Sequence, residues 1–116
     1  MPSLDVIFLD DQMIVVNKAS GLLSVPGRGD DKQDCLITRV QHEWPDALTV
    51  HRLDMATSGL LVMARGSDIQ RRLSQAFALK EVHKTYEAIV AGFLNSPEAC
   101  GLDAWHDIQM PLLIDW

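Results

Sequence analysis

An unbroken apolar run, Leu60 to Ala64, lies near the middle of the 116-residue chain and most strongly limits how the chain can fold. The small polar turn Thr57–Gly59 precedes it. A short apolar run next to turn residues is typical of a buried strand. Three ionisable side chains, His51, Arg52 and Asp54, come just before that turn. Because burying charge is costly unless the charge is paired, charge at the mouth of a buried strand is rarely accidental.

Stretches on either side of this run carry the periodicity of strands and helices. Alternating polar and apolar residues indicate strands, and apolar residues three or four apart indicate helices with one buried face. Asp34 and Ser67 are expected to cap two helices, because their side-chain oxygens can accept hydrogen bonds from the free amides of a first turn. Strands are expected at Val6–Leu9, Met13–Asn17, Leu60–Ala64 and His83–Val90, an extended stretch at Thr49–Leu53, and helices at Cys35–Glu43 and Ser67–Leu79.

Length and composition favour one compact domain that covers residues 1–116. Hydrophobic residues make up 47% of the chain, which is enough for one core and too little for two. No apolar run approaches the ~20 residues that cross a bilayer, and the first residues lack the features of a signal peptide. Cys35 and Cys100 lie too far apart in sequence to indicate a disulfide framework or a zinc site. We therefore expect a soluble, reduced protein of the cytoplasm.

The formal net charge of −6 argues mildly against a nucleic-acid partner, because phosphate binding depends on lysine and arginine. The charges are unevenly distributed, however. Acidic residues gather in turns and toward the C-terminus, whereas the segment from Arg52 to Lys84 is net basic. Its other basic residues are Arg65, Arg71, Arg72 and Lys80. The middle of the chain is thus basic within an acidic whole.

Arg52 and Asp54 are two residues apart, so in an extended segment their side chains share a face. A carboxylate beside a guanidinium stays ionised at neutral pH because the positive charge lowers its pKa. Such a carboxylate suits a nucleophile or a general base and not a general acid. The alternative for any Arg-x-Asp sequence is a structural ion pair at a strand end, since surface pairs are common and weak.

Other catalytic motifs do not match. His-Arg-Leu-Asp differs from the His-Arg-Asp of a kinase catalytic loop, and no glycine-rich loop accompanies it. The four histidines have no i, i+4 helical pair and no cysteine at ligand spacing, so no metal site is expected. A glycosidase needs two facing carboxylates, and Asp54 has no obvious second acid.

Three motifs in the chain resemble those of the RluA-type pseudouridine synthases. Val50–Arg65, VHRLDMATSGLLVMAR, closely resembles the catalytic signature of this family. Asp10–Arg28 resembles its opening strands and Asn-Lys-x-x-Gly-Leu loop, and Lys84–Gly92 is similar to its Lys-x-Tyr strand. The three motifs occur in the family's order over most of the chain. The resemblance implies an α+β fold with a mixed, largely antiparallel sheet flanked by helices.

The resemblance implies catalytic roles for three residues. Asp54 falls on the aspartate that attacks the target uridine, whose base detaches from C1′, rotates and rejoins through C5 without a metal or an organic cofactor. Arg52 falls on the arginine that helps to flip the nucleotide and fills the vacated space. Tyr86 falls on the tyrosine that packs on the target base, where stacking contributes ~1–3 kcal/mol. Without the motif, Tyr86 would be interpreted as a core aromatic residue.

The implied partner is ribosomal or transfer RNA with an exposed loop uridine, because extrusion of a base is cheapest in loops. His51 is expected to shape the motif by hydrogen bonding. Lys84 is expected to support its strand or to contact phosphate. Arg71 and Arg72 are candidate phosphate contacts, with a solvated helix face as the alternative. His51, Lys84, Arg71 and Arg72 thus form the expected substrate-binding set.

The chain departs from the family at its C-terminus. A later family motif supplies an arginine that pairs with the catalytic aspartate, and nothing here matches it. The chain ends on the apolar stretch Leu112–Trp116, where the family chain would continue. We therefore expect the N-terminal part of such a catalytic domain. Two alternatives remain at this point: a catalytically silent RNA-binding remnant, and a plain structural domain with an Arg–Asp pair.

Overall fold

A computed structural model describes residues 3–30 and 33–92. The chain divides into two units, Met1–Lys84 and Thr85–Trp116, and all the helices and strands below lie in the first. They are, in chain order, β1 (Val6–Leu9), β2 (Met13–Lys18), α1 (Leu36–Glu43), β3 (Ala47–Thr49), β4 (Gly59–Arg65) and α2 (Ser67–Ala78). In the described part of the chain no helix is long and apolar enough to cross a membrane.

The four strands form one sheet in the order β1-β2-β4-β3, and every pair of neighbours is antiparallel. Strand β4 contains the apolar run of the sequence and lies inside the sheet, between β2 and β3. Its register places Ala64 opposite Met13 and Gly59 opposite Lys18. The predicted strand and the α+β fold with a largely antiparallel sheet are thus confirmed, although Leu60 at the start of the apolar run is exposed.

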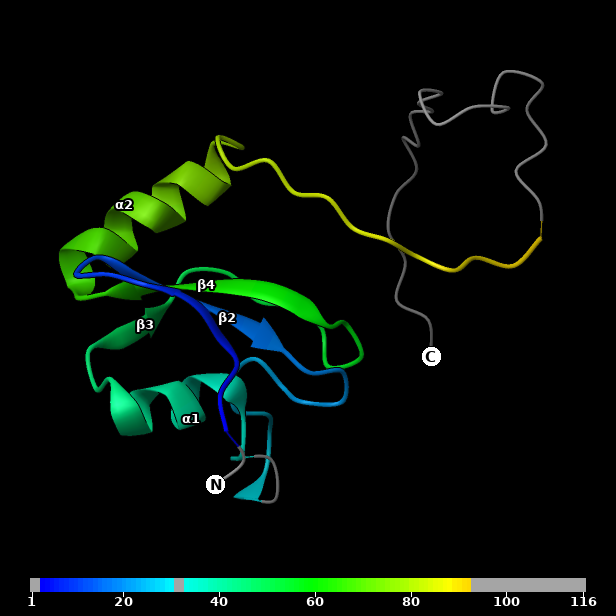
Figure 1. The fold of residues 1–116 in the computed structure, drawn as a ribbon, viewed down its shortest axis with the longest axis horizontal. Coiled ribbons are helices and arrows are strands. Elements are labelled where there is room, and N and C mark those ends of the chain that lie inside the picture. The colour runs from blue at the N-terminus through cyan, green and yellow to red at the C-terminus, as the bar shows by residue number, and fades with distance from the viewer. Residues whose placement is uncertain (1–2, 31–32, 93–116) are drawn as a thin grey trace. The chain divides into compact units, whose positions relative to one another are not determined.

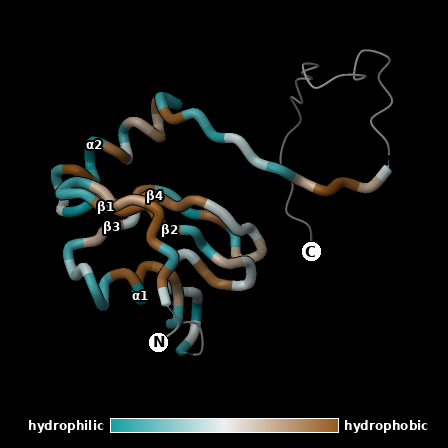
Figure 2. Tube along the Cα trace, in the orientation of Figure 1, coloured by the Kyte–Doolittle hydropathy of each residue, from teal (hydrophilic) through white to brown (hydrophobic). Residues whose placement is uncertain are grey.

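The two helices cover opposite faces of the sheet, with α1 below it and α2 above it in Figure 1. Helix α1 buries Leu36, Ile37 and Val40 against a core of β2 and β4 side chains, which includes Ile14 and Met63. Helix α2 lies against β4 and β3 but has no fully buried side chain. Figure 2 shows the hydrophobic stretches of β1, β2 and β4 gathered in the sheet. The main core therefore lies between the sheet and α1.

The start of α1 differs from the prediction. Cys35, and not Asp34, is the N-cap residue of α1, and its side chain makes no capping hydrogen bond. The Asp34 carboxylate instead accepts hydrogen bonds from Arg39 Nε and Nη2, at 2.9 and 2.8 Å. The predicted Asp34 cap is wrong because a charged donor with two parallel N–H groups competes successfully for the carboxylate.

The start of α2 also differs. Gly66 is the N-cap residue, and Ser67 already belongs to the helix. Gly66 has a φ of 92°, a conformation that glycine adopts without steric cost, and its amide donates to the Asp46 carbonyl at 3.0 Å. The predicted Ser67 cap is therefore wrong, because the turn out of β4 is built on the glycine before it.

Two extended predictions need correction. Strand β3 ends at Thr49, so the stretch expected at Thr49–Leu53 leaves the sheet after its first residue. The His51 ring takes the hydrogen bond of the Val62 amide, which a longer β3 would have accepted. The strand expected at His83–Val90 is absent, and Ile89 is fully exposed. A strand is stable only with a neighbour that pairs its backbone groups, and residues 83–90 join none of the strands of the described sheet.

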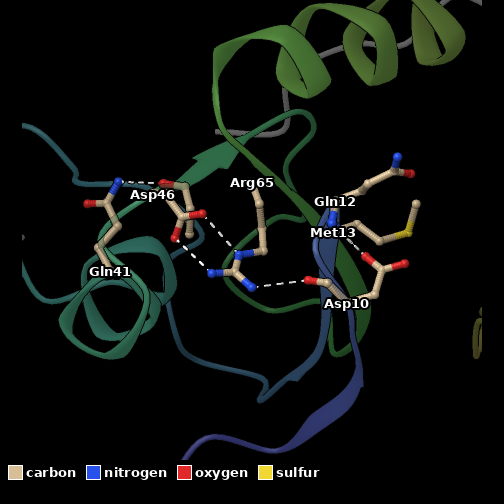
Figure 3. Close-up of polar contacts among 7 residues, drawn as sticks. Asp10, Gln12, Met13, Gln41, Asp46 and Arg65 are labelled. Atoms are coloured by element: carbon tan, nitrogen blue, oxygen red, sulfur yellow. Dashed lines mark hydrogen bonds and ion pairs between the residues drawn. The ribbon is translucent and has the colours of Figure 1, made fainter.

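Arg65, the last residue of β4, joins three segments at one end of the sheet (Figure 3). Its Nε and Nη2 atoms donate to the two carboxylate oxygens of Asp46 at 3.0 and 3.3 Å, and Nη1 donates to the Asp10 carbonyl at 3.1 Å. The Asp10 carboxylate in turn accepts the amides of Gln12 and Met13 at 2.8 Å each. Arg65 therefore connects the β1–β2 turn to the beginning of β3.

Candidate active site

Asp54 lies in the segment between β3 and β4, and residues 51–57 are called the Asp54 segment below. Leu53 is buried at 7% exposure, whereas Arg52 and Asp54 on either side of it are exposed. The Thr57 amide donates to the Asp54 carbonyl at 3.0 Å and closes a turn. Leu53 thus anchors a short segment that presents Arg52 and Asp54 to solvent.

Arg52 and Asp54 form no ion pair with each other, although both lie in the described part of the chain. The ion pairs found there join Arg39 to Asp34, Arg65 to Asp46, and Arg71 to Asp68. A structural Arg52–Asp54 pair at a strand end, the alternative left open by the sequence, is therefore not present. The carboxylate of Asp54 is exposed, and its backbone must be held by other residues.

The side chain of Lys18 holds the backbone of the Asp54 segment. Its side chain is completely buried, and Nζ donates to the carbonyl oxygens of Ala19, Leu22 and Met55 at 3.0, 2.6 and 3.0 Å. Three carbonyl acceptors match the three hydrogens of an ammonium group. The Gly21 amide donates to the same Met55 carbonyl at 2.7 Å. The carbonyl next to Asp54 in the chain is thus held by two donors.

Burial and charge act on Lys18 in opposite directions. Removal from water lowers the pKa of Lys18, while the negative charge of Asp54 raises it. Desolvation is the larger effect. The buried ammonium and the exposed carboxylate are therefore close enough to interact, and the Asp54 segment lies over a positive charge.

Two serines of the loop after β2 add to this clamp. Ser24 Oγ is buried, donates to the Leu53 carbonyl at 2.6 Å and accepts the Leu53 amide at 3.1 Å. Ser20 Oγ donates to the Ala56 carbonyl at 2.7 Å. A buried backbone group without a partner is costly, so the hydroxyl of Ser24 replaces the sheet pairing that Leu53 lacks. The backbone on both sides of Asp54 is therefore held in place.

His51 fixes the beginning of the Asp54 segment. Its Nε2 accepts the Val62 amide at 2.9 Å, and its ring stacks on Phe77 of α2, with ring centroids 4.4 Å apart and an angle of 18° between the planes. Lys84 Nζ lies 5.9 Å from the centre of the same Phe77 ring. Burial lowers the pKa of His51, and the charge of Lys84 lowers it further. These contacts agree with the expectation that His51 shapes the motif by hydrogen bonding, which stays a prediction.

The structure does not bring Arg71 and Arg72 to the Asp54 segment. Arg71 pairs with Asp68 at 2.7 Å on the exposed face of α2. Arg72 lines a groove with Met13, at the end of β2 opposite Lys18. Five residue steps separate the two ends of β2, or about 16 Å at the usual rise of an extended strand. An RNA phosphate in contact with these arginines would therefore lie far from a nucleotide bound next to Asp54.

Tyr86 belongs to the second unit and is 59% exposed. Its aromatic face is available for stacking because it is not packed into a core. Lys84, the last residue of the first unit, is exposed and lies over Phe77. In residues 3–30 and 33–92, no group of three or more His, Cys, Asp or Glu side chains is arranged to hold a metal ion.

Sequence reasoning missed Lys18, Ser24 and Phe77. A signal for Lys18 was available, because it follows Ile14 and Val16 at every second position and therefore points to the buried face of β2. Phe77 carried no signal beyond its place among the apolar residues of the helix expected at Ser67–Leu79. Ser24 carried no signal, because its role depends on a contact with Leu53, 29 residues away.

The antiparallel sheet with two helices and the exposed aspartate on a clamped segment can be compared with known protein families. Residues 12–109 match the model of the RNA pseudouridylate synthase family, and the chain belongs to this family. The computed structure is also similar to the human RNA pseudouridylate synthase domain containing 4, with a TM-score of 0.52 and 24% identity over 66% of this chain and 30% of the other. That likeness concerns the fold alone.

Several curated relatives share more of the sequence. The dual-specificity RNA pseudouridine synthase RluA of Yersinia pestis is 48% identical over 96% of this chain and 50% of its own length. The protein of the same name from Escherichia coli K12 is 44% identical over 99% of this chain and 49% of its own. The Vibrio parahaemolyticus protein is 43% identical over 99% and 43%. The chain thus spans about half the length of these relatives.

Proposed function

We propose that residues 1–116 are the N-terminal part of a single catalytic domain of an RNA pseudouridine synthase. The enzyme isomerises uridine to pseudouridine in loops of ribosomal RNA, transfer RNA or both. The observation that carries this proposal is the exposed carboxylate of Asp54 on a backbone clamped by Lys18, Ser24 and His51. A nucleophile has to reach its substrate while its own position is held, and this arrangement provides both.

In the proposed reaction, a carboxylate oxygen of Asp54 attacks the target uridine. The carboxylate oxygen bonds to C1′ as the C1′–N1 bond breaks, and the uracil rotates within the site. C5 then displaces the carboxylate from C1′, so that a C1′–C5 bond forms and Asp54 is regenerated. The proton on C5 is lost and N1 gains a proton, so the product is an isomer of the substrate. One carboxylate suffices because the base is never released to water, and no metal or cofactor takes part.

Arg52 is proposed to occupy the space from which the target nucleotide is flipped. It is exposed, as Asp54 is, and has no carboxylate partner in the described part of the chain. Its guanidinium is therefore free to contact phosphate or to fill a gap in a base stack. Tyr86 is proposed to stack on the extruded base.

The remaining basic residues are proposed as phosphate contacts at different distances from Asp54. Lys84 is exposed next to the His51–Phe77 pair and would contact the RNA near the flipped nucleotide. Arg71 and Arg72 on α2 would meet the backbone further along. Such contacts position the RNA without reading its sequence. The proposed location of the enzyme is the cytoplasm.

A catalytically silent RNA-binding remnant is the second candidate. The observation in its favour is that the chain spans about half the length of its curated relatives. The resemblance implies that catalysis uses groups on both halves of such an enzyme, whereas RNA contact needs only part of them. The two candidates differ in whether C5–H bonds are broken.

Tritium release from RNA that carries C5-labelled uridine separates the two candidates. The chain is assayed as it stands and as a fusion to the C-terminal half of the Escherichia coli relative. Release by either protein, abolished by Asp54→Asn and unaffected by Asp11→Asn in the β1–β2 turn, supports the synthase. Equal RNA binding by wild type and Asp54→Asn, without release from any protein, supports the remnant. Normal release by Asp54→Asn would exclude Asp54 as the nucleophile.

A further inference from the structure

His51 makes two contacts that together determine the state of its ring. Nε2 accepts the Val62 amide at 2.9 Å, so Nε2 carries no proton. When the contact is made, the ring is neutral and its proton is on Nδ1. A ring that is protonated on both nitrogens cannot accept this hydrogen bond. Phe77 lies against the ring at 4.4 Å with nearly parallel planes and fixes its orientation.

The contact joins the Asp54 segment to the inside of the sheet. Val62 belongs to β4, one of the two inner strands of the described sheet. His51 begins the segment that carries Asp54 three residues later. On its other side, the segment is held by Lys18 and Ser24. His51 is therefore the attachment of the segment to β4.

We propose that His51 is a positioning residue for Asp54: as the neutral Nδ1–H imidazole, it ties the Asp54 segment to the Val62 amide of β4, and Phe77 keeps its ring in place. The proposal rests on the proposed function in one respect, that Asp54 is the reacting group. Protonation of Nε2 removes the acceptor and leaves the Val62 amide without its partner. The Asp54 segment then loses its attachment to β4.

The surroundings of His51 keep it neutral. Three parts of the chain pack on it: β4 through Val62, α2 through Phe77, and the residues after α2 through Lys84. Val62 and Phe77 present uncharged groups to the ring, and the positive charge of Lys84 disfavours protonation of His51. In its own segment, Arg52 and Asp54 point their side chains to solvent.

The charged side chains of α2 that the structure places lie elsewhere. Arg71 pairs with Asp68, and Arg72 lines the groove next to Met13. Lys84 is therefore the charged group whose removal should change the proton affinity of His51 most. Lys80, an exposed lysine just after α2, provides a matched control.

NMR of the 116-residue chain tests the proposal without any enzymatic assay. Long-range ¹H–¹⁵N spectra report which nitrogen of His51 carries a proton, and a titration from pH 8 to pH 5 follows the ring and the Val62 amide together. We expect an unprotonated Nε2 at neutral pH and one common transition for the ring and the amide. Lys84→Met should shift this transition to higher pH, and Lys80→Met should not. A proton on Nε2 at neutral pH, or a Val62 amide that ignores the titration, would overturn the proposal.

Hydrogen exchange tests the link to Asp54. At each pH, wild type is compared with His51→Gln, whose amide oxygen can accept the Val62 amide and does not titrate. Below the His51 transition, the amides of the Asp54 segment should exchange faster in wild type than in His51→Gln. Equal exchange in the two proteins would contradict a positioning role. These results do not depend on tritium release, so a failure of the proposed function is separate from a failure of this inference.

Discussion

Lys18 Nζ donates a 3.0 Å hydrogen bond to the carbonyl oxygen of Met55, the residue that follows Asp54. The bond joins positions 37 residues apart in sequence and connects two of the motifs that resemble the pseudouridine synthases. The end of β2 and the loop that follows it therefore support the Asp54 segment. Their polar groups face backbone atoms of that segment and leave the Asp54 carboxylate open to solvent.

Lys18→Met should destabilise the protein by about 3 kcal/mol. The substitution keeps much of the side-chain volume but leaves the carbonyls of Leu22 and Met55 without the Lys18 donor. Urea unfolding measures the effect. Lys80→Met, which changes an exposed lysine, should cost less than about 0.5 kcal/mol. Equal stability of the two variants would show that Lys18 does not hold the Asp54 segment.

Ser24→Ala should cost about 2 kcal/mol, because both backbone groups of buried Leu53 lose their partner. Ser20→Ala should cost less, since the Ala56 carbonyl that Ser20 serves is exposed and can bond to water. Hydrogen exchange of the Leu53 amide gives a local measurement. If its protection were the same in Ser24→Ala and wild type, the Ser24 hydroxyl would not be its support.

His51 should make stability depend on pH. Its pKa is lowered in the folded protein, mainly by burial, so the unfolded chain binds the proton more readily. The contribution of neutral His51 is fully present above the unfolded pKa of ~6.5 and is lost as the pH falls through the lower folded value. Urea unfolding at pH 7.5 and pH 5.5 should show a larger loss for wild type than for His51→Gln. The matched variant His42→Gln, at an exposed position of α1, should behave as wild type.

Arg65→Leu should lower the thermal midpoint because Asp46 and the Asp10 carbonyl lose a shared partner. Arg65→Lys should recover only part of the loss, since an ammonium cannot bond both carboxylate oxygens in the same planar way. RNA binding at several salt concentrations provides the second readout. Arg65 is engaged within the protein, so neither variant should change the salt dependence of binding. A reduced salt slope would instead make Arg65 a phosphate contact.

Periodicity predicted most of the secondary structure. The apolar run at Leu60–Ala64 lies in β4, and the amphipathic stretches after Cys35 and Gly66 form α1 and α2. These elements bury a continuous face, so local pattern and tertiary packing agree. The strand at His83–Val90 failed for the opposite reason: alternation describes a strand, but only a neighbouring strand can pair its backbone.

The candidate site was predictable in part. The motif identified Arg52 and Asp54, and the structure exposes both side chains on one clamped segment. The clamp itself was not found, because an isolated lysine or serine is usually interpreted as a solvated surface residue. The cap at Asp34 failed because Arg39 binds its carboxylate, and the cap at Ser67 failed because the helix already begins after Gly66.

The nucleophilic role of Asp54 is tested most directly by the single-turnover rate of tritium release. The rate is measured on the fusion that carries the C-terminal half of the Escherichia coli relative. Asp54→Asn keeps the size of the side chain and the backbone contacts but replaces one carboxylate oxygen by an NH₂ group and removes the negative charge that a nucleophile needs. Asp54→Asn should release tritium at least about a thousandfold more slowly and still bind the RNA, whereas Asp11→Asn should match wild type. Release by Asp54→Asn at the rate of the active wild-type fusion would show that Asp54 is not the nucleophile.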